Sequence, residues 1–162
     1  MEFSELLVRL LLAVVAGAVI GWEREWRQKP AGLKTHILVT LGSAAFVIAA
    51  LKFFEELEGR QTGADMMKVI GGIVGGVGFL GAGTIMRTGG NVHGLTTAAT
   101  IWVAAAIGVA VGFGYVELAG LCVLLAMLTL IAFELIERVF FPQPKEAPQP
   151  QQPAESDPSG KQ

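Results

Sequence analysis

Long apolar runs separated by short polar segments dominate this chain. A helix needs roughly 20 apolar residues to cross the hydrocarbon core of a bilayer. Five runs approach or reach that length, and the pattern predicts an all-α, multi-pass bundle of five spans. The expected spans are about 6–22, 35–54, 69–86, 95–113 and 116–136. Gly112 and Gly114 allow a tight reversal between the last two. An arrangement of four spans, which merges or drops one run, is the alternative.

Charge placement predicts how these spans are oriented. Glu2 and Glu5 precede the first run and basic residues follow it, which argues for an uncleaved span rather than a secretory signal. In the five-span arrangement, eight of the twelve Lys and Arg residues fall on the side of the 23–34 loop and the C-terminal tail. The positive-inside bias therefore places the N-terminus outside and the C-terminus in the cytoplasm.

Composition supports this class and narrows the possible functions. The chain is 52% hydrophobic and 16% charged, with a net charge of −2, so neither a soluble small domain nor a nucleic-acid-binding protein is expected. Six of the seven prolines lie in the last 21 residues. This change divides the chain into a transmembrane domain, 1–141, and a disordered Pro/Gln-rich tail, 142–162.

Catalytic and metal-binding groups are sparse. A single cysteine, Cys122, excludes an intramolecular disulfide, and the two histidines, His36 and His93, stand far apart in the sequence. Gly76, Gly78 and Gly81 fit a dinucleotide-binding pattern, but they lie inside an apolar span without the strand and the acidic residue that such a site needs. We therefore expect neither catalysis nor a cofactor, and the sequence leaves a metal site undetermined.

Glycines recur at four-residue spacing within the spans, and the third span is the richest in them. In lipid, small residues let helix backbones approach closely, so the spacing predicts tight packing within the bundle or in a homodimer. The alternative is that these glycines loosen the third span and expose carbonyls to an ion or a partner. The expected packing residues are Gly17, Gly21, Gly71, Gly75, Gly78, Gly81, Gly83, Gly108 and Gly112.

A few polar residues stand at span ends where a generic interface does not explain them. Glu23 lies beside basic residues, which predicts an ion pair with Arg24 or Arg27 and a charged docking surface. Thr96 is expected to cap the fourth span and, with Thr100, to form a hydroxyl-bearing face. Arg9, one turn into the first span, is expected to reach the interface and pair with Glu5.

Three segments together resemble the membrane domain of the MgtC/SapB family over about residues 17–114. They are the run GWEREWRQKPAGLKTHILVTLGSAAF, the motif GFLGAG, and the later motif GLTTAA followed by a tryptophan. The family's G-x-E-R-E falls on 21–25, its A-G-L-[KR]-T-H on 31–36, and its acidic residue before the third span on 65. From these motifs and the polar span ends we expect a functional network of Glu23, Arg24, Glu25, Lys34, His36, Asp65, Arg87, Asn91, Thr96 and Thr97.

The resemblance implies a bacterial inner-membrane protein linked to adaptation to low magnesium and, in pathogens, to survival inside host cells. The chain looks like a short form that lacks the soluble C-terminal domain of some members. We expect a non-enzymatic regulator or accessory factor that contacts another membrane protein in the bilayer, as a homodimer or other homo-oligomer, without nucleic acid. The alternative is a small transporter of Mg²⁺ or another cation. Transport is disfavoured because Glu117 and Glu134, the acids within the expected spans, stand near the span ends.

Overall fold

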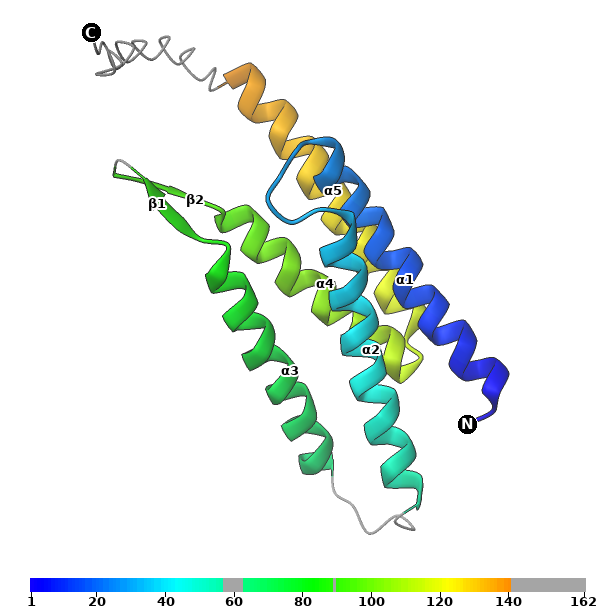
Figure 1. Cartoon of the computed structure of the whole chain (residues 1–162). Coiled ribbons are helices and arrows are strands. Elements are labelled where there is room, and N and C mark those ends of the chain that lie inside the picture. The colour runs from blue at the N-terminus through cyan, green and yellow to red at the C-terminus, as the bar shows by residue number, and fades with distance from the viewer. Residues whose placement is uncertain (57–62, 89, 141–162) are drawn as a thin grey trace, which may run out of the picture.

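The structure is a computed structural model that describes residues 1–56, 63–88 and 90–140, with side chains through residue 133. The described part contains five helices, all long and apolar enough to cross a membrane, which confirms the multi-pass helical fold (Figure 1). The predicted tail lies outside the described residues. The elements are α1 (Phe3–Trp26), α2 (Leu33–Glu56), α3 (Gly63–Gly83), β1 (Met86–Thr88), β2 (Asn91–His93), α4 (Leu95–Phe113) and α5 (Val116–Phe140).

Two boundaries differ from the expectation in ways that affect the polar residues. Helix α1 continues through Trp26, so Glu23, Arg24 and Glu25 lie on its last turns rather than in a loop. Helix α3 begins at Gly63 but ends at Gly83, three residues before the expected end of the span. It ends there because the amides of Thr84 and Ile85 donate to carbonyls three residues back, which tightens the chain into a turn.

A short antiparallel β-hairpin joins α3 to α4, where the sequence indicated only a turn. Met86 pairs with His93, Arg87 with Val92 and Thr88 with Asn91. Helix α4 then starts from Gly94, which has a φ of 91° and whose added Cβ would collide with the Thr84 carbonyl. No side chain caps this end of the helix, so the expected capping role of Thr96 is wrong.

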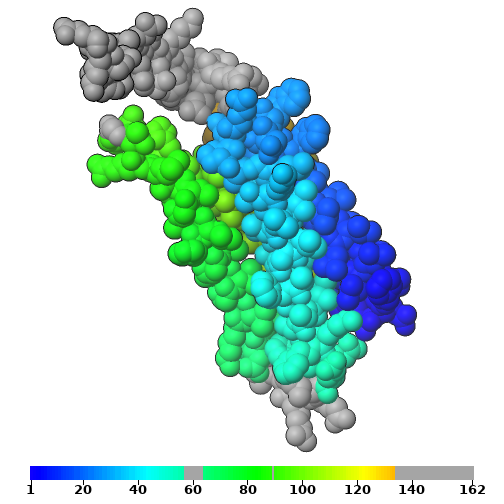
Figure 2. Space-filling model, in the orientation of Figure 1, coloured from blue at the N-terminus to red at the C-terminus, as the bar shows by residue number. Residues whose placement is uncertain are grey.

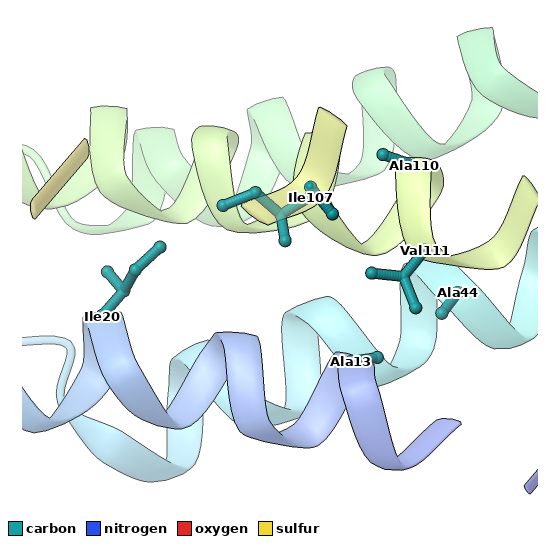
Figure 3. Close-up of a cluster of buried hydrophobic side chains, with 7 residues drawn as sticks. Ala13, Ile20, Ala44, Ile107, Ala110 and Val111 are labelled. Carbon is teal, nitrogen blue, oxygen red and sulfur yellow. The ribbon is translucent and has the colours of Figure 1, made fainter. Parts of the chain in front are cut away.

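Helix α4 is central to the bundle, with α1 and α2 packed against it, α3 on one side and α5 on another (Figure 1). Ala13 and Ile20 of α1, Ala44 of α2, and Ile107 and Val111 of α4 form one core cluster between these helices (Figure 3). All five side chains are essentially inaccessible. This cluster lies where α1, α2 and α4 cross, and a second one joins α2, α3 and α4 through Val47, Ile73, Val77 and Ile101.

The glycines expected to pack helices together fall into two groups. At four of them, a Cβ would meet a neighbouring helix or the α1–α2 connection closer than real contacts allow: Gly17, Gly21, Gly108 and Gly112. Gly81 of α3 has an ordinary contact with Ala98 of α4. At the remaining expected positions, Gly71, Gly75, Gly78 and Gly83, a Cβ would meet nothing within 4 Å in the described chain. The expectation that these four pack helices within one bundle is therefore wrong.

Arg9 clamps the end of the bundle where α4 turns into α5. Its guanidinium donates to the Gly112 carbonyl at 2.7 Å and forms an ion pair with Glu5, as the i,i+4 spacing predicted. Gly114 ends α4 with a φ of 86°, and an added Cβ there would lie 2.9 Å from the Arg9 guanidinium. The positive charge thus caps the carboxyl end of α4, and the glycine leaves room for it.

Candidate functional site

Buried polar side chains from three helices meet at the end of the bundle that carries the α1–α2 connection and the β-hairpin (Figure 1). We name this cluster the polar junction and define it as Glu23, Arg24, His36, Thr97 and Thr100. Each is at most 8% exposed, and His36 is completely buried. Ionisable side chains are costly inside a membrane protein, so their burial marks the polar junction as the candidate functional site.

Glu23 and its basic neighbours form the charged part of the polar junction. Its carboxylate makes an ion pair with Arg27 one turn later, and its Oε2 lies 3.9 Å from the Arg24 guanidinium. Neither carboxylate oxygen accepts a directional hydrogen bond from the described residues, and the Nε of Arg24 likewise has no acceptor among them. The charges are therefore held by proximity, and part of their hydrogen-bonding capacity is unused.

Hydrogen bonds connect the charged part to α2 and α4. Arg24 Nη2 donates to the Thr97 hydroxyl at 3.2 Å, which links α1 to α4. On α2, His36 Nε2 lies 3.1 Å from the Thr100 hydroxyl, and its Nδ1 lies 2.9 Å from the Gly32 carbonyl. The polar junction is therefore a continuous set of contacts across three helices that are distant in the sequence.

Two buried hydroxyls extend the polar face of α2 toward the middle of the helix, and sequence reasoning missed both. Thr40 donates its hydroxyl toward the Ala13 carbonyl of α1 at 2.8 Å, and Ser43 is 4% exposed one turn further. The spacing of 36, 40 and 43 places all three polar residues on one face, a signal that was available in the sequence. Beyond Ser43 the same face becomes apolar, with Ala44, Val47 and Ile48 buried.

The α1–α2 connection is shaped by Glu25. Its carboxylate accepts a hydrogen bond from the backbone amide of Leu33 at 3.0 Å, which satisfies one of the free amides at the start of α2. A Cβ at Gly32 would require this carboxylate to move away from its present position. Glu25 thus joins the last turn of α1 to the start of α2, the helix that carries His36.

The structure does not bring the whole expected network together. The side chains of Lys34, Arg87, Asn91 and Thr96 are exposed. Asp65 begins α3 at the opposite end of the bundle, where it binds Lys68 at 2.9 Å. The buried threonine near Thr100 is therefore Thr97 and not Thr96. Thr97 lies on the inward face of α4, whereas Thr96 is exposed.

The arrangement suits charge pairing and hydrogen bonding better than metal binding. Among the described residues, no group of three His, Cys, Asp or Glu side chains could hold a metal ion. Mg²⁺ favours carboxylates and keeps several waters, whereas Glu23, the one carboxylate of the polar junction, lies against two arginines. The polar junction is therefore a buried contact network that joins three helices.

Comparison with known proteins finds one matching family model and several similar proteins. The MgtC family model matches residues 10–139. YhiD of Escherichia coli (strain K12), for which magnesium transport has been proposed, is 42% identical over 139 residues, which cover 85% of this chain and 63% of YhiD. Protein MgtC of Salmonella typhimurium (strain LT2) is 47% identical over 108 residues, covering 67% of this chain and 43% of that protein.

Protein SrpB of Synechococcus elongatus is 41% identical over 142 residues, which cover 81% of this chain and 76% of SrpB. The chain thus spans less than two thirds of the length of YhiD and MgtC. No solved structure matches it.

Proposed function

Since this chain belongs to the MgtC family, we propose that it is a non-enzymatic inner-membrane protein that supports adaptation to low magnesium and envelope homeostasis by contacting another membrane protein. The observation that carries the proposal is the outward face of α3. A chain that acts by contact needs a face that its own fold leaves uncovered, and α3 presents one.

That face follows a regular pattern of five small residues and one lysine. Ala64, Lys68, Gly71, Gly75, Gly78 and Ala82 are separated alternately by four and three positions, and all six are exposed. Such 3.5-residue spacing keeps one seam of a helix turned toward a partner helix. Figure 2 shows α3 along one edge of the molecule, with its outer side open.

The cost of these glycines supports a role outside the single chain. In water, each glycine in a helix interior costs about 1 kcal/mol relative to alanine. The core glycines offset such a cost through close helix contacts, but Gly71, Gly75 and Gly78 make no comparable contact in the described chain. A second transmembrane helix, from another protein or from a second copy of this chain, would offset it through close backbone packing.

The test is a pair of leucine substitutions on α3 in the full chain, expressed in a host that lacks its own copy. Gly75→Leu fills the outward seam. Val74→Leu, the matched control, changes the preceding residue, which lies about 100° around the helix axis from Gly75. We expect Gly75→Leu to keep normal protein levels and to lose growth at limiting magnesium, and Val74→Leu to keep both. Full growth of the Gly75→Leu strain would contradict the proposal. Crosslinking in the same membranes separates a homodimer from a different partner.

A second candidate function is transport of Mg²⁺ or another cation, favoured by the proposed role of YhiD and by the polar face that reaches Ser43. The purified chain in liposomes that moves Mg²⁺ down a gradient, faster than empty vesicles leak it, would establish transport and displace the regulatory role. Absence of flux, together with the growth defect of Gly75→Leu, would leave the regulatory role standing.

A further inference from the structure

His36 and Thr100 together make three contacts that need more protons than the two side chains carry when His36 is neutral. Its Nδ1 lies 2.9 Å from the Gly32 carbonyl, and its Nε2 lies 3.1 Å from the Thr100 hydroxyl. The same hydroxyl lies 2.9 Å from the Thr97 carbonyl. All four groups belong to the polar junction or to the turn that precedes α2, and the imidazole is completely buried.

The contacts that run from Gly32 through His36 and Thr100 to Thr97 can exist in two protonation states. A carbonyl only accepts, so the Gly32 contact requires a proton on Nδ1, and the Thr97 contact requires the hydroxyl proton of Thr100. If that proton points to Thr97, the Nε2 contact is a hydrogen bond only when Nε2 carries its own proton. In neutral His36, the Thr100 hydroxyl must instead turn toward Nε2 and release the Thr97 carbonyl.

We propose that His36 is a proton-binding site through which the three-helix polar junction responds to acidification. On the acidic side, a proton from solvent binds Nε2, the new N–H donates to the Thr100 oxygen, and the hydroxyl proton of Thr100 turns to the Thr97 carbonyl. On the alkaline side the proton leaves Nε2 and the hydroxyl turns back. No covalent bond other than N–H forms or breaks.

The charged groups around His36 determine what an added proton does. Glu23 and Arg24 of α1 act on it electrostatically, and α4 carries no charged side chain. Asp65 and Lys68 of α3 lie at the opposite end of the bundle, as does Glu117 at the start of α5. Arg27 already pairs with Glu23.

An imidazolium at His36 would therefore add a third positive charge to Arg24 and Arg27, in a cluster whose one carboxylate is Glu23. Both oxygens of Glu23 are buried and accept no hydrogen bond from the described residues, so they have capacity for it. Protonation would therefore change the charge balance at the polar junction, where α1 meets α2 and α4. Since proton binding depends only on the polar junction, this inference stands independently of the proposed role in magnesium adaptation.

The test is ¹⁵N NMR of the histidine rings in the full chain in nanodiscs, between about pH 5 and pH 8, the range in which histidine titrates. His93 in the exposed hairpin is the internal reference. We expect His36 to carry its proton on Nδ1 at the alkaline end and to gain a second on Nε2 on acidification. An Nε2 that stays unprotonated, or one that stays protonated, over the whole range would overturn the proposal.

A matched pair of substitutions tests the role of the hydroxyl. Thr100→Val removes the oxygen that accepts from the protonated Nε2, and we expect about tenfold weaker proton binding by His36 because a hydrogen bond to the charged form is lost. Thr129→Val makes the same change at an exposed α5 threonine that bonds within its own helix, and should leave the titration unchanged. Equal titration in the Thr100→Val and wild-type chains would overturn the proposed proton chain. If Thr100→Val does not fold, the titration of His36 in the wild-type chain tests the proposal by itself.

Discussion

The close crossing of α2 and α4 gives a sharp prediction for two glycines that the sequence does not distinguish. At Gly112, an added Cβ would lie 2.7 Å from the Val47 Cβ and 2.9 Å from the Ala44 carbonyl oxygen. Both obstacles are fixed to the α2 backbone and cannot rotate away. At Gly75 on α3, the same Cβ would meet nothing within 4 Å in the described chain.

The expected effects have opposite signs. Non-bonded carbon atoms prefer separations of about 3.5–4.0 Å, so Gly112→Ala must push the two helices about 1 Å apart. Overpacking of this kind costs about 1–3 kcal/mol. Gly75→Ala removes only the flexibility of glycine and should gain up to about 1 kcal/mol if the partner is absent. We therefore expect the two variants to differ by about 1–4 kcal/mol in free energy of unfolding.

The measurement is reversible unfolding of the purified full chain in mixed micelles, followed by helical circular dichroism. Both substitutions add one methyl group to a glycine in an apolar helix, so differences in hydrophobicity cancel. A stability loss at Gly75 as large as that at Gly112 would refute the assignment of Gly75 to an uncovered face of α3. Equal, unchanged stability would refute the close α2–α4 crossing.

Three further predictions address the charged groups. Arg24→Ala should cost about 1.5–3 kcal/mol, because the Thr97 hydroxyl loses its charged donor and Glu23 keeps Arg27 as its paired positive charge; unchanged stability in the same unfolding assay would contradict this role. Arg9→Gln should cost about 1–3 kcal/mol, since the carboxyl end of α4 loses a charged donor; an unchanged midpoint would count against that cap. The predicted topology can be tested with a membrane-impermeant thiol reagent after the native Cys122 is replaced by serine. A cysteine at Gln28 should then react from the cytoplasmic side and one at Glu55 from outside. The reverse pattern would contradict the predicted topology.

Much of the fold could be predicted from the sequence because the bilayer makes strict demands on it. Each span must bury its backbone polar groups in helical hydrogen bonds and present apolar side chains to lipid, so length and hydropathy reveal it. The range 95–113 agrees with α4, and the five-span fold is confirmed. The i,i+4 pair of Glu5 and Arg9 was predictable for a similar reason, since it depends only on local helix geometry.

The candidate site could be predicted only in part. Glu23, Arg24 and His36 stand out as polar residues at span ends, but Thr100 and Thr40 look like ordinary helix threonines until α1, α2 and α4 are placed together. Which of two adjacent threonines faces inward depends on the rotation of α4, which the apolar pattern does not specify because almost every residue of that helix is apolar. Asp65, a motif residue, lies at the other end of the bundle.

The glycines show most clearly which features can be predicted from the sequence and which need the tertiary structure. Four-residue spacing identifies faces capable of close approach, and it does so equally for Gly108/Gly112 and Gly71/Gly75. Only the three-dimensional arrangement shows that the first pair touches α2 and that the second faces outward. The sequence by itself determined the existence and order of the spans and their small-residue faces, because these follow from local geometry and hydropathy. The tertiary structure decided which faces meet, because that depends on how five helices share one limited core.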